Sequence, residues 1–181
     1  GKQKMRTTQV TAQWDGGGPD GKRVEGGAQR NGREMYNLYK VDINTGKETA
    51  RTNEKTGHVD GPEDSPDGKY SYYNANPTGT MQIWRMKPDG TAREQLTFDE
   101  HHNWFPHISP DSKWIVYISF ANDIEPNGHP SYKKVTLNLM PTSGGAPKVI
   151  AYLYGGQGTI NVNSWSPDSK HIAFVSNSEQ T

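Results

Sequence analysis

Short runs of hydrophobic residues recur along this chain, and each follows a tight turn directly. The clearest are 114–118 and 171–175, which are typical of short buried strands, and 70–73, which is typical of an aromatic, half-buried strand. In the turns, proline presets φ, aspartate can accept hydrogen bonds from the backbone N–H groups just ahead, and Gly or Ser tolerates the third position. The sequence therefore predicts a repeated β-hairpin.

The turn sequence occurs four times at a regular interval. Its prolines are Pro19, Pro66, Pro110 and Pro167, so the successive spacings are 47, 44 and 57 residues. Periods of roughly 40 to 50 residues with several strands per unit are typical of propeller blades. We therefore predict an all-β chain, a β-propeller built from four-stranded antiparallel blades.

The pattern predicts one propeller domain over 1–181, with about three and a half blades. The predicted blades span 10–54, 58–98 and 103–152, with a half blade over 159–178. An insertion over 121–132 accounts for the longest spacing. The first blade matches the repeat least well, because Gly26 and Gly27 stand where the other copies carry β-branched or aromatic residues.

Three and a half blades do not close a ring, since closed propellers typically have about 4 to 8. Two possibilities remain open: the chain is part of a longer polypeptide, or two copies self-associate to close the ring. The chain begins at Gly1, as expected of a mature or trimmed form.

Composition excludes several classes of protein. The chain has 20 Lys and Arg against 20 Asp and Glu and no concentrated basic stretch, so nucleic-acid binding is not expected. No apolar run approaches the ~20 residues of a membrane-spanning helix. Cysteine is absent, which removes disulfides, cysteine-ligated zinc and thiol catalysis. The 5 Trp, 9 Tyr and 4 Phe argue against disorder, despite 20 Gly and 12 Pro.

The repeat resembles the WD-repeat-like blades of the TolB family. The resemblance rests on Ser-Pro-Asp-Gly-Lys followed by a hydrophobic strand, an aromatic-containing strand that ends in Asp-Gly or Gly-Gly, and Leu-Thr; it is clearest over 81–97, 105–120 and 164–176. It implies a six- or seven-bladed propeller, often periplasmic, and a role in binding proteins. Similar blades also occur in prolyl-oligopeptidase-type peptidases and oligogalacturonate lyases, so the fold does not choose among these functions.

The connections between strands are expected to divide between the two faces of the disc. The Pro-Asp turns and the turns at Gly90 and Gly144 share one face. The other face collects the loops 99–103 and 154–158 and the insertion 121–132. Because irregular polar loops from adjacent blades often carry function, we expect this loop-rich face to bind a partner.

Histidines and carboxylates near the loop-rich face suggest a metal site, but we prefer to interpret them as ordinary polar side chains of exposed loops. The histidines are His101, His102, His107 and His129, and none is part of a His-x-x-x-His pattern. The resemblance to the lyases implies a Gln-x-x-His-x-His metal motif. Here Gln157 is followed by Ile160 and Val162, neither of which can bind a metal, so we expect no metal and no cofactor.

The sequence also supports neither a serine peptidase nor a phosphate-binding loop. No Gly-x-Ser-x-Gly nucleophile elbow occurs, and the glycine-rich stretch 155–158 lacks the Lys-Ser/Thr ending of a phosphate loop. Trp84, Trp114 and Trp165 are expected to pack between blades rather than form a carbohydrate platform.

We therefore predict a non-enzymatic scaffold that binds a protein, extended peptide or glycan partner through its loop-rich face. The expected binding residues are His102, Asn103, Trp104, His129, Gln157 and Asn161. The alternative is a ligand- or metal-binding propeller associated with polysaccharide or peptide degradation. The expected location is the periplasm or another exported compartment, with the cytoplasm as the alternative.

Overall fold

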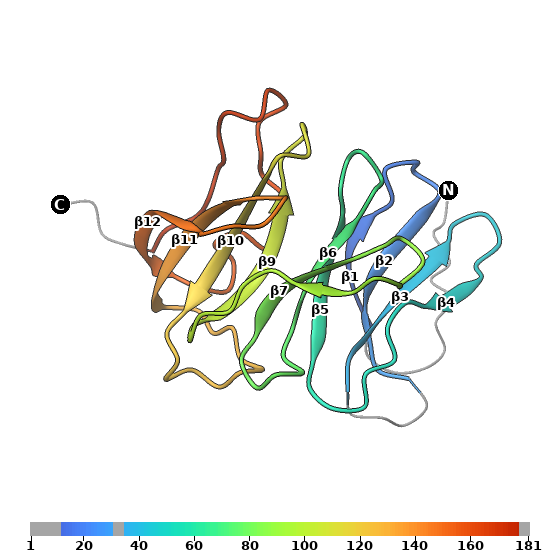
Figure 1. Cartoon of the computed structure of the whole chain (residues 1–181), viewed down its shortest axis with the longest axis horizontal. Helices are drawn as coiled ribbons and strands as arrows, with labels where there is room; N and C mark the ends of the chain where they lie inside the picture. Colours follow the sequence, from blue (N-terminus) through green and yellow to red (C-terminus); the bar gives the residue numbers. More distant parts are fainter. Residues whose placement is uncertain (1–11, 31–34, 178–181) are drawn as a thin grey trace.

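The part of the chain that the structure describes folds into β-strands, turns and loops, which confirms the predicted fold class. The computed structural model describes residues 12–30 and 35–177. Its strands form three four-stranded antiparallel sheets, in the orders β1-β2-β3-β4, β5-β6-β7-β8 and β12-β11-β10-β9. Over the described ranges no helix is long and apolar enough to cross a membrane. The three sheets are three blades of a partial propeller, placed side by side (Figure 1).

Each sheet is an up-and-down meander of strands that are consecutive in the sequence. The first contains β1 (Ala12–Gly17), β2 (Arg23–Ala28), β3 (Asn37–Asp42) and β4 (Glu48–Ala50). The second contains β5 (Val59–Asp64), β6 (Ser71–Ala75), β7 (Gln82–Met86) and β8 (Glu94–Gln95). The third contains β9 (His102–Ile108), β10 (Trp114–Phe120), β11 (Lys133–Pro141) and β12 (Lys148–Gly155).

Within the predicted half blade over 159–178, the residues described up to 177 form a hairpin rather than regular strands. A bridge joins Trp165 to Ile172, and Ala173 N donates to the Ser164 carbonyl oxygen at 3.1 Å. No third or fourth strand flanks it within the described residues, so its outer side chains, including Val162 and Val175, are exposed.

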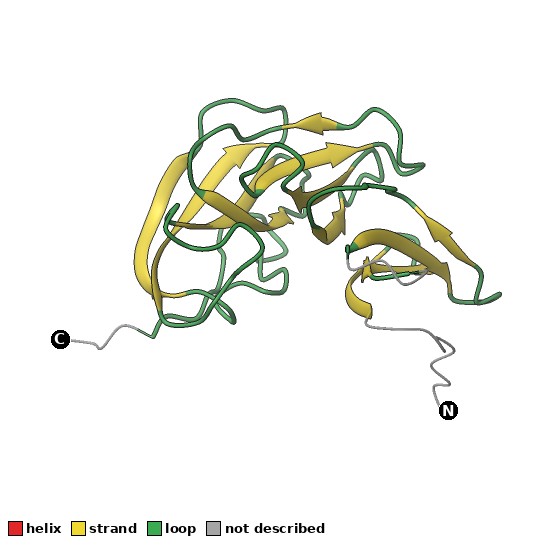
Figure 2. Ribbon diagram, turned by 90° about the horizontal axis from the view of Figure 1, so that it is seen from below, coloured by secondary structure: helices red, strands yellow, loops and turns green. Residues whose placement is uncertain are grey.

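The hydrophobic core lies between the sheets, because each blade has apolar residues on both of its faces. Leu38, Val59 and Met86 pack between the first and second blades, and Tyr72, Ile83 and Ile115 between the second and third. On the far side of the third blade, a cluster around Ile118 and Phe120 extends to Ile160 in the hairpin. Figure 2 shows the sheets arranged like a fan, and the side chains between neighbouring sheets form these clusters.

The three Ser-Pro-Asp turns repeat one set of hydrogen bonds. In the turns that begin at Ser65, Ser109 and Ser166, the serine Oγ donates to the aspartate Oδ1 at 2.7, 2.6 and 2.6 Å. The same Oδ1 accepts from the lysine backbone N–H at 3.1 Å in all three turns. The serine hydrogen bond, with this backbone bond, holds the pKa of Asp111 and Asp168 below the ordinary value of 3.8.

Neighbouring turns also bond to each other along one face of the molecule, at the top of Figure 1. Asp67 N donates to Ser112 Oγ at 3.2 Å, and Asp111 N donates to Ser169 Oγ at 3.0 Å. Both serines have positive φ values, 59° and 60°, and Gly68 takes φ 68° at the equivalent position. Glycine adopts this conformation without strain, but only serine can supply the hydroxyl that links the turns.

Gly27 of the first blade has a packing role that accounts for part of the poor match of this blade to the repeat. Strand β5 lies so close to β2 that a Cβ atom at Gly27 would lie 2.6 Å from Asp60 Oδ1. A β-branched or aromatic residue does not fit there. Glycine in β2 thus lets the first two blades approach each other.

Candidate functional site

The insertion of the third blade forms a wall on the loop-rich face. It joins β10 to β11 and is tied to two other parts of the chain. Gln157 N donates to the Pro130 carbonyl oxygen at 3.2 Å, and Asn76 Nδ2 donates to Asn127 Oδ1 at 2.7 Å. The insertion is therefore fixed both to the loop after β12 and to the second blade, although it has no regular secondary structure of its own.

An open groove of about 840 Å³ lies along this insertion. Its charged residues include two acids and one base, so it offers both kinds of ionic partner to a bound molecule. We call it the insertion groove; it is lined by Asp123, Ile124, Glu125, Asn127, Gly128, His129, Pro130, Ser131, Lys133 and Gln157.

Two of the six predicted binding residues, His129 and Gln157, line the insertion groove. Both are partly exposed. Asn161 lies nearby in sequence, at the turn that follows Gln157, where its Oδ1 accepts a hydrogen bond from Gly158 N at 2.8 Å. Its amide oxygen therefore stabilises the turn.

The other three predicted residues are buried beneath the loops. Trp104 is 0% exposed, and its ring meets the edge of the His129 ring at a centroid distance of 4.5 Å. Phe105 also contacts His129, at 5.2 Å. Trp104 Nε1 has no hydrogen-bond partner among the described residues. The tryptophan thus supports the groove residue His129 from below and presents no surface to a partner in this structure.

His102 and Asn103 hold the loops around β9 in place. His102 Nδ1 accepts a hydrogen bond from Met81 N at 3.2 Å, and its ring also bonds to the backbone of Ile124 in the insertion. Burial lowers the pKa of His102, which favours the neutral imidazole that accepts from Met81. Asn103 Nδ2 donates to Asp99 Oδ2 at 3.0 Å and to Gln82 Oε1 at 3.1 Å.

The remaining histidines considered as metal ligands are dispersed. His107 Nδ1 lies 2.7 Å from Glu63 Oε2, and its other ring nitrogen bonds to the Ile160 carbonyl oxygen, so it links three successive units. His101 pairs with Asp99 at 3.4 Å. The described part of the chain contains no group of three or more His, Cys, Asp or Glu residues that could hold a metal ion.

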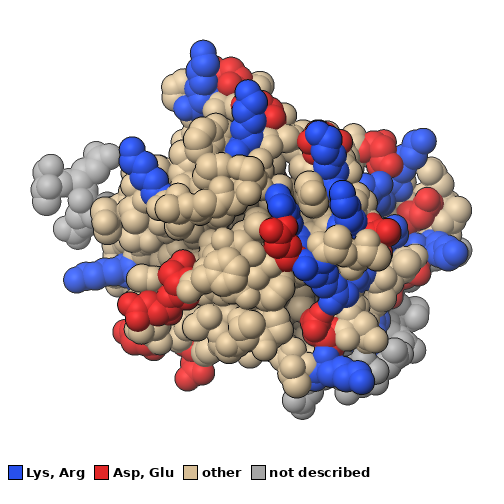
Figure 3. Space-filling view, viewed as in Figure 1, with Lys and Arg blue, Asp and Glu red and all other residues tan. Residues whose placement is uncertain are grey.

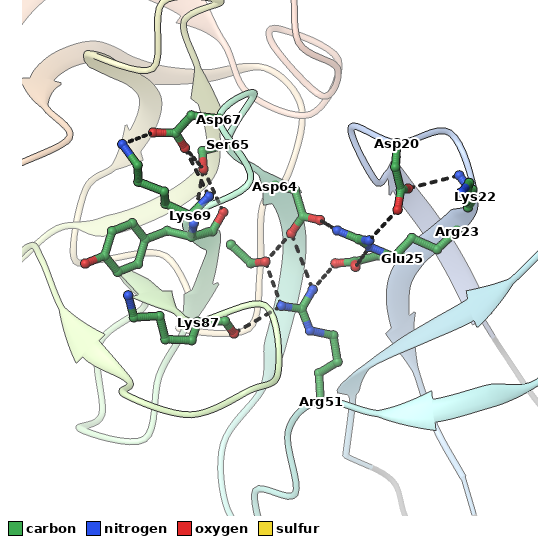
Figure 4. Close-up of polar contacts among 12 residues, drawn as sticks. Asp20, Lys22, Arg23, Glu25, Arg51, Asp64, Ser65, Asp67, Lys69 and Lys87 are labelled. Carbon is green, nitrogen blue, oxygen red and sulfur yellow. Dashed lines mark hydrogen bonds and ion pairs between the residues drawn. The ribbon is translucent and has the colours of Figure 1, made fainter.

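A buried ionic network between the first two blades was not anticipated from the sequence. Arg51 Nη2 donates to Ser71 Oγ at 2.7 Å, and Arg51 also pairs with Glu25 and with Asp64 (Figure 4). Arg23 Nη2 binds Asp64 at 2.7 Å from the other side. Burial raises the pKa of Glu25, and the two guanidinium groups oppose that effect. The partners are up to 41 residues apart, so no local pattern reveals them.

Comparisons with known proteins find a relative of similar sequence and a solved structure of similar fold. The chain is 38% identical over 175 residues to an uncharacterized protein of Agrobacterium fabrum, and the match covers 97% of this chain and 58% of the relative. The solved structure of a protein proposed to be TolB from Agrobacterium tumefaciens matches with a TM-score of 0.87 and 38% identity, over 94% of this chain and 60% of that one.

More distant structures share the fold alone. TolB from Acinetobacter baumannii has a TM-score of 0.67 at 21% identity, over 89% of this chain and 36% of that one. An oligogalacturonate lyase in complex with manganese has a TM-score of 0.58 at 15% identity, over 90% of this chain and 52% of that one. No protein-family model matches.

The chain spans 58% of the length of the Agrobacterium fabrum relative and 60% of that of the Agrobacterium tumefaciens structure. Its three blades, their turns and these matches lead to one conclusion: the chain has the fold of a TolB-like β-propeller.

Proposed function

We propose that this TolB-like propeller is a non-enzymatic scaffold that binds an extended segment of a protein partner in the insertion groove. The observation that carries the proposal is the wall of the groove, a long loop fixed at Asn127 and Pro130 by contacts to other parts of the propeller. Loops of this length without secondary structure are usually functional in compact domains. A preorganised wall lowers the entropy cost of binding.

The chemistry of the groove favours a polypeptide over a small molecule. The groove is wide open and contains ionic side chains of both signs, Asp123 and Glu125 opposite in charge to Lys133. His129 adds an aromatic surface that Trp104 and Phe105 hold from behind. An extended segment can satisfy such dispersed groups one after another, whereas a small ligand usually requires an enclosed pocket. The resemblance to TolB supports protein binding and an exported location, the periplasm.

Site-specific photo-crosslinking tests the proposal. A photoreactive benzoylphenylalanine is placed at Ser131 in the groove wall and, as the control, at Lys69 on the turn face, where the lysine side chain is 72% exposed. Both proteins are irradiated in extract from the source cells, and the crosslinked partner is identified. We expect one partner to crosslink at Ser131 and not at Lys69.

Substitutions then measure the contribution of the groove to that binding. Lys133→Glu should weaken the purified complex at least about tenfold, as expected when one charged contact is replaced by a repulsive one. The matched control Lys113→Glu changes a lysine that is 74% exposed on the turn face and should have no effect. Equal crosslinking at both sites, or equal effects of both substitutions, would refute the proposal. Loss of binding in a chelator would instead favour the metal-dependent alternative.

A further inference from the structure

The outermost strand of the third blade differs from its counterparts in the first two. Strands β4 and β8 have 3 and 2 residues and contain Glu48 and Glu94. Strand β12 has 8 residues and no charged side chain after Lys148. Proteins usually protect sheet edges by keeping edge strands short or charged, because an unprotected edge pairs with other chains. The first two blades follow this rule, and the third does not.

The side chains of β12 are exposed on both faces of the sheet. Tyr152 is 82% exposed and Ile150 40%. The two side chains have different neighbours. Ile150 lies beside Trp165 and Ile172 of the hairpin, whereas Tyr152 lies near His101, on the side of the second blade. Figure 3 shows a largely uncharged surface over β10–β12, with acidic side chains gathered along its lower border, whereas the half of the molecule that contains β1–β8 has many charged side chains.

The backbone of β12 faces outward at the positions needed for a further strand. β12 is the edge of its sheet, with β11 as its neighbour. The Tyr154 carbonyl oxygen accepts a hydrogen bond from Asn177 N at 2.7 Å, so it points away from β11. Asn177 thus lies against this end of the edge, and a further strand would pair with the part of β12 before Tyr154. Backbone groups of an antiparallel strand alternate in direction with a period of two residues. The N–H and C=O of Tyr152 therefore also point outward.

A groove of about 490 Å³ lies next to this edge, lined in part by His101, Ser119, Thr136 and Tyr152. It can receive alternate side chains of an added strand. Tyr132, directly before β11, adds an aromatic group that is 62% exposed and close to Tyr154, with ring centroids 6.4 Å apart. Tyr132 has a φ of 60°, which a bulky residue adopts only at a cost in free energy.

We propose that β12 is a docking edge that takes up an extended acidic segment of a partner protein as a fifth strand of the third blade. Main-chain hydrogen bonds from Tyr152 would hold the segment, and the groove beside Tyr152 would receive its apolar side chains. The segment is expected to be acidic because the sheet that it would join is basic. Strands β9–β12 contain Lys133, Lys134 and Lys148 and no Asp or Glu.

The same charges argue against a second copy of this chain as the occupant. Antiparallel pairing of two β12 strands would bring Lys148 of each copy toward the end of the other sheet that carries Lys133 and Lys134. An acidic strand meets no such repulsion. The proposal does not depend on the insertion groove, because the two surfaces are lined by different residues.

Three synthetic octapeptides test the docking edge on the whole chain. The first has the sequence DVTYTVTD, the second replaces both aspartates by lysine, and the third is the acidic peptide with alternate N-methylated amides. Binding to the ¹⁵N-labelled chain is followed by chemical-shift changes and by amide hydrogen exchange. We expect the acidic peptide to shift the signals of β12 and to slow exchange at Tyr152 at least tenfold. Both other peptides should bind at least tenfold more weakly.

Variants distinguish strand addition at β12 from peptide binding elsewhere on the chain. Tyr152→Glu should weaken the acidic peptide at least tenfold, and Thr49→Glu on the exposed outer strand β4 is the matched control. Glu125→Gln, which removes an ionic group of the insertion groove only, should leave this affinity unchanged, so failure of one proposal is distinguishable from failure of the other. The proposal is overturned if the acidic peptide leaves β12 unshifted at millimolar concentration, if N-methylation has no effect, or if sedimentation shows a dimer that Tyr152→Glu dissociates.

Discussion

Gly156 lies where the chain leaves β12 and passes the insertion. Its φ is 119°, and a Cβ atom added there would collide with the Pro130 carbonyl oxygen. Pro130 cannot withdraw cheaply, because the same oxygen accepts the hydrogen bond from Gln157 N that fixes the groove wall. Gly156→Ala should therefore destabilise the chain and loosen the insertion groove together.

Gly158 provides a matched control two residues further on. Its φ is also positive, 94°, but a Cβ atom there would meet no atom within 4 Å. Gly158→Ala should therefore cost only the backbone strain, about 1 to 3 kcal/mol. Gly156→Ala adds a steric term of about 1 to 3 kcal/mol, for a total of about 2 to 6 kcal/mol. In a domain of this size, each kcal/mol lowers the melting temperature by about 2 to 4 °C.

Urea unfolding followed by tryptophan fluorescence measures both free energies. Amide hydrogen exchange at Gln157 reports the local effect, because its N–H bonds to Pro130. We expect faster exchange at Gln157 in Gly156→Ala and less change in Gly158→Ala. Equal destabilisation by the two substitutions would refute the argument, since it would show that the close approach to Pro130 contributes nothing beyond strain.

Three further predictions concern the turns and the ionic network. The pKa of Asp111 is lowered, so its carboxylate stabilises the fold at pH values above the ordinary pKa of 3.8, and this stabilisation is lost as the pH falls below that value. Asp111→Asn should therefore make the free energy of unfolding, measured in urea, fall less between pH 5 and pH 2. Ser112→Ala removes the acceptor for Asp67 N and should cost about 0.5 to 1.5 kcal/mol, whereas Ser112→Gly should cost less because it relieves the positive φ, as thermal melts would show. Arg51→Ala removes the more deeply buried of the two guanidinium groups that compensate Glu25 and Asp64, and it should cost about 3 to 5 kcal/mol in chemical denaturation. Arg23→Ala should cost less, because the Arg51 side chain is 1% exposed and that of Arg23 is 24% exposed; equal effects would contradict this reasoning.

Part of the candidate site could be predicted because it depends on loop composition. The insertion and the loop after β12 are polar, irregular and close to strand ends, and the structure brings them together at Pro130 and Gln157. The burial of Trp104 could not be predicted in the same way. An aromatic residue beside a loop can face solvent or the core, and the contact with His129 decides between them only after the insertion folds back over β9.

The exposed edge of the third blade was visible in the sequence only as an uncharged run after Lys148. The predicted third blade ends at residue 152, but β12 continues to Gly155 because its last residues pair with the start of β11. That register depends on the length of the insertion between β10 and β11. It is a property of the folded sheet rather than of the local sequence.

The amino-acid sequence by itself determined the strands, the turns and the propeller class. Proline, aspartate and glycine specify each turn within about five residues, and hydrophobic alternation specifies the strand that follows, so these features need no distant contacts. The tertiary structure alone decided the rest: the ion pairs of Arg51, the close approach of Gly27 to Asp60, and the wall of the insertion groove. Each of these joins residues of different blades, and their energies arise only when the blades pack against one another and exclude water.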